Sequence, residues 1–578
     1  MAEQQAVNTQ QPTEPLTLID QIDEAGFSVV YELGLCDRIP NFCYWLEGTS
    51  QPAAFAAYGV LLVLGLIGLW LVWALIRAWY RSALKKVEAQ ERIDEYNNTI
   101  AGAARFGTYD DLAKAHAAGK DADGLIVGRE GWHKELVYYG DDAHLITFAP
   151  TGSGKGTSAI VPNLLSYMGS VVCIDPKGEN AQITARRRRE LGQDVFILDP
   201  WNLASEESAQ FNPLTLLDPK SPDFSDDTKL IAEALVVADK DDHWTREAKA
   251  LINAFITYIA CHEPPEKRTL GRLNEILSMP PEKMDFLLKN MSEKSPYPVV
   301  QRAGSRILQK QEKERSSVIS SAQSQLHFLE SERMNSVLST GHNHCDLQNI
   351  KQRNMTVYLV LPAERLASHS RWLRLMISMI MRTMSYDRTP VDIPVLFLLD
   401  EFAALGYLEE MEKSVPLMRG YGVKLWPILQ DLSQLHHYYP KTWQSFIANA
   451  GAIQVFGTND QGTADYFSKR CGTETRVSKT QGSPTQHSDG VTYGRTGRPL
   501  MLPEEIMQID QYNQLLFLKS LHPFKIGKSF FYDSHKYGSE FVGQYDASSY
   551  SPQYQPKGIA VPKGKKKKSR LWKRKKSA

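Results

Sequence analysis

A glycine-rich loop that ends in a lysine carries the clearest chemistry in this chain. An apolar run over residues 145–148 leads into the loop, whose residues are Ala149-Pro150-Thr151-Gly152-Ser153-Gly154-Lys155-Gly156, followed by Thr157 and Ser158. Glycines let the backbone curl so that several N–H groups point at phosphate oxygens, and the helix expected next adds its positive N-terminal end. Lys155 can reach the outer phosphates. The loop therefore predicts a site for ATP and Mg²⁺ over residues 151–158.

Two positions depart from the usual phosphate-loop pattern G-x-x-x-x-G-K-[ST]. Ala149 stands at the first glycine, and Gly156 follows the lysine where Ser or Thr is usual. The hydroxyl for magnesium must then come from Thr157 or Ser158, and we favour Thr157. The alternative is an ordinary Gly/Ser loop between a strand and a helix.

A pair of acids far along the chain supplies the second half of this site. Residues 394–399 form a continuous apolar run that ends in Asp400 and Glu401. Such a run suits a central strand of a parallel sheet, whose carboxyl end emerges beside the phosphate loop. Asp400 can then orient Mg²⁺ through its water shell, and Glu401 can polarise the attacking water as a general base. The alternative is that the two acids only cap the next helix.

Strand-like apolar runs and helical stretches surround these motifs. The runs cover residues 144–148, 170–174, 194–198, 356–361, 395–399, 423–428, 452–456 and 514–518. Their alternation with helical stretches predicts an α/β fold, a parallel sheet wrapped by helices. Over residues 223–342 helical periodicity replaces the strand pattern, which predicts an inserted all-α domain that is either a scaffold or a substrate-reading lid. A Ser-, Thr- and Gly-rich stretch over 472–499 predicts a flexible surface loop.

Residues 53–76 form an uncharged apolar segment. A helix of this length would measure about 36 Å, which is long enough to cross a bilayer. Tryptophans collect towards its end, and the bases that follow directly are Arg77, Arg81, Lys85 and Lys86. The positive-inside rule then places the N-terminus outside and the large C-terminal part in the cytoplasm. The alternative is a buried core helix.

Charge is distributed unevenly, although the net charge of the 578 residues is zero. Residues 1–52 carry eight acids and one base, whereas residues 557–578 carry eleven bases and no acid. The basic tail 549–578 has few core-forming residues, so we expect it to be disordered and to attract DNA phosphates or anionic lipid, or to have no partner. Cys36 and Cys43 in the acidic segment could form a disulfide or remain thiols.

Further motifs, taken in chain order, resemble those of one family. They are Asp175-Pro176-Lys177-Gly178-Glu179, Asp199-Pro200, Asn212-Pro213-Leu214, Glu314-Arg315-Ser316-Ser317, Leu399-Asp400-Glu401-Phe402, Leu429-Gln430-Asp431 and Arg498-Pro499-Leu500. Together with the phosphate loop, including its glycine after the lysine, this set is similar to that of type IV secretion system coupling proteins, the TraG-like conjugative DNA-transfer ATPases. The resemblance covers residues 87–535.

The resemblance implies a RecA-like P-loop NTPase motor domain with an inserted all-α domain, in a homo-hexameric ring at the bacterial inner membrane. It implies ATP hydrolysis coupled to delivery of relaxase-bound single-stranded DNA, or of protein effectors, to the channel components of a type IV secretion system. Many relatives carry two membrane helices, whereas this chain shows one. The outward N-terminus therefore depends on the charge rule alone.

Four more residues take roles in such a motor. Asp175 and Glu179 lie at a strand end from which a carboxylate can reach the metal or a water. Gln430 follows the run 423–428 and can sense the γ-phosphate by hydrogen bonding. Arg419 can act in trans, stabilising transition-state charge in a neighbouring subunit; the equal alternative is a cation at a helix C-terminus.

The chain then divides into an acidic outer tail, a transmembrane helix, a linker with an entry subdomain, a motor in two parts around the all-α domain, and a basic tail. The outer tail covers residues 1–52, the transmembrane helix 53–76, and the linker with the entry subdomain 77–142. The two parts of the motor cover 143–222 and 343–548, the all-α domain between them 223–342, and the basic tail 549–578. The leading function is membrane-anchored, ATP-driven pumping of DNA during conjugation. The alternatives are a pump for secreted protein effectors or toxins, a nucleotide-binding membrane receptor without motor activity, and a segregation pump for double-stranded DNA.

Overall fold

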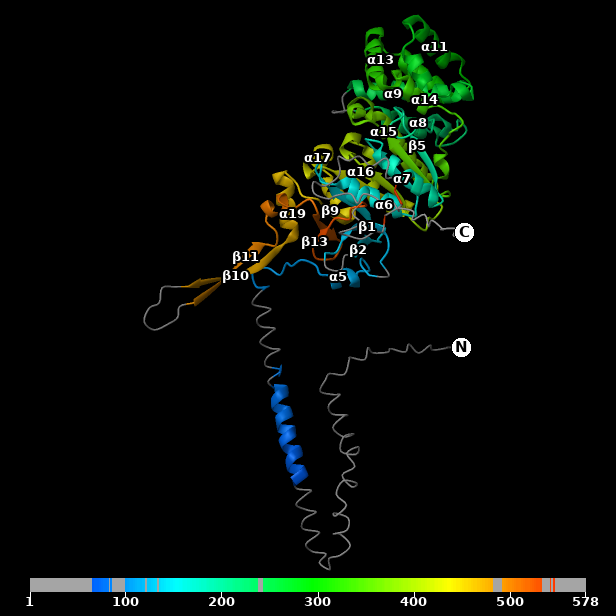
Figure 1. Cartoon of the computed structure of the whole chain (residues 1–578). Helices are drawn as coiled ribbons and strands as arrows, with labels where there is room; N and C mark the ends of the chain where they lie inside the picture. The colour runs from blue at the N-terminus through cyan, green and yellow to red at the C-terminus, as the bar shows by residue number, and fades with distance from the viewer. Residues whose placement is uncertain are drawn as a thin grey trace, which may run out of the picture. The chain divides into compact units, whose positions relative to one another are not determined.

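The computed structural model of the protein describes residues 65–82, 84–85, 99–119, 122–131, 135–237, 243–481, 491–532, 541 and 544–545. The chain divides into two compact units, Met1–Asn97 and Asn98–Ala578. In the first unit residues 65–82 are helical (Figure 1). Among the described residues, no helix combines the length and the apolar character that a bilayer crossing needs. The predicted membrane segment begins outside the described residues, and the acidic segment with its two cysteines and the basic tail lie wholly outside them.

In its described residues, the second unit contains an eleven-stranded sheet and a two-stranded hairpin. The strands are β1 (Leu125–Arg129), β2 (Leu136–Tyr139), β3 (His144–Phe148), β4 (Val171–Asp175), β5 (Asp194–Leu198), β6 (Met355–Val360), β7 (Val395–Leu399), β8 (Val423–Leu429), β9 (Ala450–Val455), β10 (Thr473–Gln481), β11 (Val491–Pro499), β12 (Asn513–Leu518) and β13 (Phe524–Gly527). Their order across the large sheet is β2-β1-β13-β12-β9-β3-β8-β7-β4-β6-β5. The predicted apolar runs correspond to β3 through β9 and to β12, so those strand predictions are confirmed.

The large sheet has a parallel half and an antiparallel half. Strands β9, β3, β8, β7, β4, β6 and β5 pair in parallel, whereas β12, β13, β1 and β2 pair antiparallel. A parallel strand covered on both faces needs no alternation of polar and apolar residues, and β7 is buried along its whole length. The prediction of an α/β fold is confirmed, but the sheet is mixed and not wholly parallel, because β1 and β2, which precede β3, and β12 and β13, which follow β9, add antiparallel pairs.

Helices cover both faces of the sheet. They are α5 (Tyr109–Lys114), α6 (Val161–Ser166), α7 (Glu179–Glu190), α8 (Phe224–Leu235), α9 (His243–His262), α10 (Leu270–Leu277), α11 (Pro281–Lys294), α12 (Pro298–Leu308), α13 (Glu312–Leu326), α14 (Glu332–Val337), α15 (Leu366–Tyr386), α16 (Glu409–Met418), α17 (Leu432–Tyr438), α18 (Trp443–Asn449), α19 (Gln461–Cys471) and α20 (Pro503–Met507). Short 3₁₀ or π turns are η1 (Gly156–Ile160), η2 (Pro213–Leu216), η3 (Pro265–Lys267), η4 (His327–Glu330), η5 (Leu347–Asn349), η6 (Ala363–Arg365), η7 (Phe402–Leu405) and η8 (Arg419–Tyr421). Alternate residues of β4 show the two layers, because Val172 and Ile174 share an apolar core with α15, whereas Val171 and Cys173 share another with α6 and α7.

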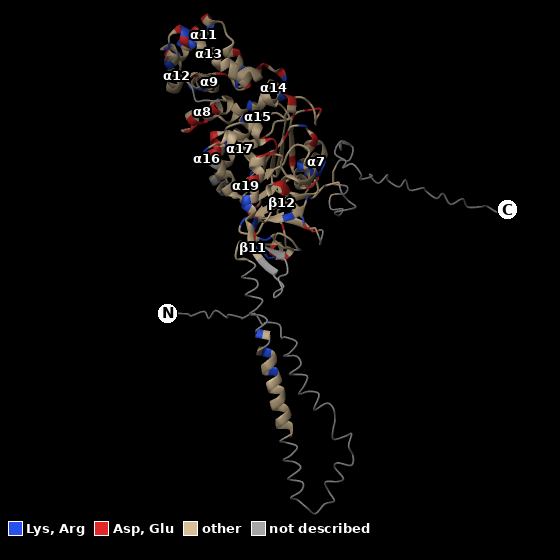
Figure 2. Cartoon of the chain, turned by 90° about the vertical axis from the view of Figure 1, so that its left-hand side faces the viewer, with Lys and Arg blue, Asp and Glu red and all other residues tan. Residues whose placement is uncertain are grey.

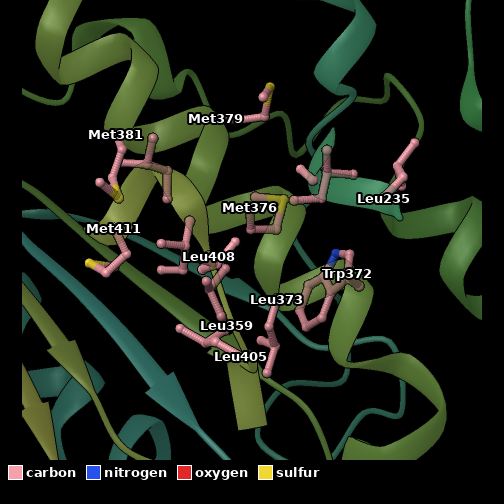
Figure 3. Close-up of a cluster of buried hydrophobic side chains, with 14 of the residues drawn as sticks. Leu235, Leu359, Trp372, Leu373, Met376, Met379, Met381, Leu405, Leu408 and Met411 are labelled. Atoms are coloured by element: carbon pink, nitrogen blue, oxygen red, sulfur yellow. The ribbon is translucent and has the colours of Figure 1, made fainter. Parts of the chain in front are cut away.

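Helix α15 joins the sheet to a helical end of the second unit. Figure 1 shows α9, α11, α13 and α14 gathered at this end, and the hairpin β10–β11 at the opposite end. The buried side chains around α15 that Figure 3 labels are Leu235, Leu359, Trp372, Leu373, Met376, Met379, Met381, Leu405, Leu408 and Met411. They come from α8, β6, α15, η7, the chain before α16, and α16 itself. Flexible methionines fill the irregular space where the helical end meets the sheet.

Two parts of the second unit differ from the sequence-based expectation. The stretch predicted as a flexible loop contains a paired hairpin, in register from Thr473↔Pro499 to Gln481↔Val491. Threonines and valines recur on both strands, and these β-branched residues favour strands despite their polar neighbours. Strands β1, β2 and β13 are not among the predicted runs, because strands of four or five residues give little periodic signal, and β1 and β13 also contain Gly and a basic residue.

Candidate nucleotide-binding site

The phosphate loop leaves the carboxyl end of β3 and runs into η1 and α6. Gly152 has a φ of +79° and Gly154 a φ of +86°, a left-handed conformation that glycine adopts without steric cost. A Cβ atom built on Gly152 or on Gly156 would meet no atom within 4 Å, so open space lies beside the loop. The backbone is thus curled and accessible, as phosphate binding requires.

The two hydroxyls after the lysine share one acceptor. Thr157 Oγ1 donates to the carbonyl oxygen of Gly154 at 3.1 Å, and Ser158 Oγ donates to the same oxygen at 2.7 Å. Both residues are buried. This geometry does not show which of the two hydroxyls would bind magnesium, so Thr157 as the magnesium ligand stays a prediction.

Lys155 lies between Asp400 and Glu401, the two acids that the sequence predicts to share its site. Its Nζ is 2.8 Å from Asp400 Oδ1 and 2.6 Å from Glu401 Oε1, although Glu401 is 246 positions away in the chain. The sheet order explains the meeting, because only β8 separates β3 from β7 and all three strands are parallel. Carboxyl ends of parallel strands emerge at one edge. The expected contact between the lysine and the acid pair is observed.

Gln430 emerges at the same edge, directly after β8. Its Nε2 makes a long contact of 3.5 Å with Glu401 Oε2. Glu401 itself has a φ of +57°, which is uncommon for a residue with a side chain and persists where the surroundings hold it. Its N–H donates to Asp400 Oδ1 at 3.0 Å. The two acids therefore form a rigid turn that brings both carboxylates to Lys155.

This cluster holds one cation and two carboxylates. The side chains of Lys155, Asp400 and Glu401 are 16%, 12% and 27% exposed. Burial lowers the pKa of Lys155, but attraction by the two carboxylates outweighs burial and the pKa is raised. Burial raises the pKa of Asp400, and Lys155 opposes that rise. A partly buried site with surplus negative charge favours a second cation.

Asp175 and Glu179 follow the neighbouring strand β4, at the same carboxyl ends of the parallel strands. Asp175 ends β4, beside β7, and its Oδ2 accepts the N–H of Ala181 in α7 at 2.9 Å. Burial raises the pKa of Asp175 to about 7, and Asp400 adds to this rise while the backbone N–H groups oppose it. Glu179 begins α7. The structure shows Asp175 as a partner of the first turn of α7, and the metal roles of both acids stay predictions.

Arg419 lies at the amino ends of the parallel strands, whereas Lys155 and the acid pair lie at their carboxyl ends. It begins η8, between α16 and the start of β8 at Val423, whereas Lys155 follows the carboxyl end of β3. Its Nη2 is 3.1 Å from Asp141 Oδ1, and the two side chains are about half-exposed. A finger that acts in trans would serve a neighbouring subunit, so that role stays a prediction. The position at the end of α16 also suits the alternative of a helix-end cation.

Two buried cations near the site were not found from the sequence. Lys528 follows β13, and its Nζ donates to the carbonyl oxygen of Ser153 in the phosphate loop at 2.9 Å. Arg374 of α15 donates to the carbonyl oxygens of Leu405 and Tyr407, at 2.5 and 2.7 Å, just after the acid pair. Arg374 interrupts an apolar stretch of α15, and a lone charge in such a stretch was the one local signal.

The oxygen donors beside the loop are few, as in sites where magnesium is bound mainly by a nucleotide. Over the described ranges, no group of three or more His, Cys, Asp or Glu residues lies close enough to hold a metal ion. Magnesium is usually held by one or two carboxylates together with substrate phosphates and waters. Asp400, with a hydroxyl of Thr157 or Ser158 beside the open loop, is a donor set that suits a magnesium ion arriving with a triphosphate.

Comparisons with known proteins agree with this geometry. A family model described as Type IV secretory system Conjugative DNA transfer matches residues 97–557. The chain is 27% identical over 404 residues to the Conjugal transfer protein TraG of Agrobacterium fabrum, covering 68% of this chain and 60% of that protein. It is 27% identical over 429 residues to the Type IV secretion system-coupling protein VirD4 of Bartonella henselae, covering 71% and 65%. The chain therefore spans less than two thirds of the length of these relatives.

The fold is similar to solved structures of the plasmid coupling protein TrwB. The complex of TrwB with ADP and Mg²⁺ gives a TM-score of 0.56 at 15% identity, over 74% of this chain and 94% of that chain. The complex with the non-hydrolysable ATP analogue ADPNP gives 0.56 at 17% identity, over 74% and 93%. At these identities the likeness shows the fold alone, an α/β architecture with a large mixed sheet.

Proposed function

The chain belongs to the type IV secretory system conjugative DNA transfer family, and from that premise we propose that it is a membrane-anchored, ATP-driven coupling protein. It recruits relaxase-bound single-stranded DNA to a type IV secretion channel and pumps it during conjugation. The observation that carries the proposal is Lys155 held between Asp400 and Glu401 beside an open phosphate loop. Relatives named for conjugal transfer support DNA as the cargo.

Lys155 is the residue whose partners change when nucleotide binds. Its ammonium leaves the two carboxylates and takes phosphate oxygens instead, and the loop N–H groups bind further phosphate oxygens. Asp400 would then orient the water shell of a magnesium ion, which would supply positive charge at the phosphates. Glu401 is free to accept a proton from the attacking water, and Gln430 beside it responds to the outer phosphate.

Two variants test whether the site drives transport. Lys155→Ala removes the phosphate-binding cation, and Glu401→Gln keeps the shape of the side chain but removes the base. We expect ATP hydrolysis and DNA transfer between cells to fall by about 100-fold or more in both, since a positioned general base contributes on that scale. Lys519→Ala, a change at an exposed lysine after β12, is the control. Normal transfer by both site variants would mean a non-catalytic receptor.

The helical end is where we place cargo docking. A cavity of about 450 Å³ lies among α8, α9, α12 and α13. Its charged lining has six bases and two acids, which are Lys229, Arg246, Lys249, Arg306, Lys310, Arg315, Glu233 and Glu247. Figure 2 shows residues of both signs spread over this end of the unit. Two of these bases, Lys310 and Arg315, are also paired with Glu314 and Asp285 outside the lining. The bases that remain in excess favour an acidic surface of the cargo.

Charge reversal at the cavity tests this docking site. Lys249→Glu together with Arg306→Glu should reduce DNA transfer but leave ATP hydrolysis unchanged, since the cavity lining is separate from the phosphate loop. Lys289→Glu, on the exposed side of α11, is the matched control. Equal transfer by the double variant and the control would place docking elsewhere.

Cross-linking in cells decides the cargo, because recovery of secreted proteins without a relaxase would favour the effector pump.

We also propose a single-pass protein of the bacterial inner membrane that assembles as a homo-hexamer. The uncharged segment 53–76 and the bases that follow it support the anchor, with the N-terminus outside. The basic tail would bind anionic lipid or DNA on the cytoplasmic side. Protease access to an N-terminal tag in intact spheroplasts tests the orientation, and native mass spectrometry of the detergent-extracted protein tests the hexamer.

A further inference from the structure

A short segment after the last strand of the sheet runs along the phosphate loop. We call residues 528–532 the strap. Lys528 Nζ donates to the carbonyl oxygen of Ser153 at 2.9 Å, and the N–H of Phe531 donates to the carbonyl oxygen of Thr157 at 3.1 Å. The ring of Phe530 lies 3.3 Å from the position of a Cβ atom on Gly154. The strap therefore touches the loop along most of its length, from Ser153 to Thr157.

Lys528 is held in surroundings that are costly for an ammonium group. Its residue is 0% exposed, and Nζ lies 4.3 Å from the centre of the Phe456 ring. Burial lowers its pKa to about 8, and attraction by Asp510 opposes this change. A buried cation that faces an aromatic ring and a single carbonyl is poorly compensated. An apolar residue would pack at this position without the cost of burying a charge, so packing alone does not explain a lysine here.

The hydrogen bond from Lys528 fixes the orientation of one peptide of the loop. In a trans peptide, the carbonyl of one residue and the N–H of the next point in opposite directions. The Ser153 carbonyl faces the strap, so the N–H of Gly154 faces away from it. Loop N–H groups of this kind bind phosphate oxygens. Among the described residues, the hydroxyl of Ser153 is buried and has no hydrogen-bond partner.

We propose that Lys528 is a positioning residue of the nucleotide site. It holds the Ser153–Gly154 peptide so that the N–H of Gly154 is presented to a phosphate oxygen, and its charge lies behind the loop on the side opposite the ligand. Because the strap directly follows β13, it connects the antiparallel half of the sheet to the phosphate loop. This inference rests on the proposed function, because it requires that the loop binds a nucleotide.

Lys528→Met in the full-length protein is the decisive variant, because methionine keeps an unbranched side chain and removes the charge and the donor. Binding of the fluorescent analogues mant-ADPNP and mant-ADP with Mg²⁺ is titrated, and melting temperatures are measured with and without nucleotide. We expect about ten-fold weaker binding or more for both analogues, as for loss of a hydrogen bond from a charged group. The melting temperature of the free protein should stay level or rise, since the buried ammonium is gone. Lys525→Met, at an exposed lysine of β13, should bind like the wild type.

The outcomes separate a positioning role from a packing role. Binding by Lys528→Met at wild-type strength overturns the proposal, whether or not its melting temperature falls. Lys528→Arg, which retains the charge and the donor, should recover part of the affinity, and no recovery would contradict the proposal. The wild-type affinity for mant-ADPNP should decline between pH 7 and pH 9.5 more steeply than that of Lys528→Met, and identical profiles would contradict it too. If the wild type itself binds neither analogue, the proposed function fails, and this failure is distinct from that of the strap.

Discussion

At the phosphate loop one lysine lies between two carboxylates, whereas at the junction of α15 and α8 one arginine faces one carboxylate. The junction pair is Arg382 and Asp227, with Arg382 Nε 2.6 Å from Asp227 Oδ1 and a second contact from Nη2 to Oδ2. Tyr386 adds its hydroxyl to Asp227 at 3.2 Å and its ring beneath the guanidinium at 4.4 Å. Arg382 and Asp227 therefore balance each other within the chain.

The two clusters also differ in their access to solvent. The side chains of Arg382 and Asp227 are 11% and 6% exposed, whereas Glu401 in the loop cluster reaches 27%. A balanced and enclosed pair holds two helices together, and its removal leaves an uncompensated charge. A surplus carboxylate near solvent is available to a ligand or a metal. Charge balance together with access therefore separates a structural ion pair from a functional one in this molecule.

The clearest contrast between the two clusters is expected in ligand binding at the loop. Lys155→Met should weaken nucleotide binding by about 100-fold or more, because the cation for the outer phosphates is lost. Wild-type protein at a hundred times its Kd of ADPNP with Mg²⁺ should gain about 2.7 kcal/mol of stability. The variant at the same concentration should gain almost none, as measured by chemical unfolding with and without nucleotide. A variant that is stabilised as much as the wild type would contradict the functional assignment of this cluster.

The next effect is on stability, at the junction. Arg382→Met should lower the free energy of unfolding by about 3–5 kcal/mol, because Asp227 is left buried and unpaired. Nucleotide affinity of the folded variant should stay at the wild-type value. The double variant Arg382→Met with Asp227→Leu should recover most of the loss, since no charge is then left alone. Loss of nucleotide binding in folded Arg382→Met would show that the junction is part of the site.

A fourth acid sharpens the comparison because it is partly buried and, among the described residues, its Oε2 atom is buried without a hydrogen-bond partner. Burial raises the pKa of Glu410 in α16 to about 7, while a hydrogen bond with Ser378 and attraction by Arg374 oppose the rise. The folded protein then holds a proton that the unfolded chain releases above its ordinary pKa of 4.5. Stability should therefore fall as pH rises from 4.5 to 7 and then level off.

Glu410→Gln should remove that loss, because the amide stays neutral at every pH. Its advantage over the wild type in the free energy of unfolding should be small at pH 5 and grow to about 1–3 kcal/mol at pH 8. Glu409→Gln, at the neighbouring acid paired with Lys413, is the control. An advantage that shrinks as pH rises would mean that Glu410 is ionised and compensated in the fold.

The nucleotide cluster could be predicted from the sequence, whereas the junction and the strap could not. Lys155 ends a glycine-rich loop and Asp400 ends an apolar run, so each residue stands in a local pattern with a known position in parallel sheets. Arg382 and Asp227 are 155 positions apart inside two helices, and their meeting depends on how those helices pack. Lys528 follows the short strand β13, whose pairing with β12 and β1 is decided by contacts far along the chain. Residues placed by packing alone leave no motif.

The smallest effect is expected at a third ion pair, which is the most exposed of the three. Arg419 and Asp141 have side chains that are 51% and 42% exposed at a separation of 3.1 Å. Water screens such a pair, so Asp141→Asn should change the free energy of unfolding by about 1 kcal/mol or less, with nucleotide affinity unchanged. Chemical unfolding and a mant-ADPNP titration measure both quantities. A loss as large as that of Arg382→Met would mean that exposure does not decide what an ion pair contributes here, and the distinction between the enclosed junction and the accessible site would lose its physical basis.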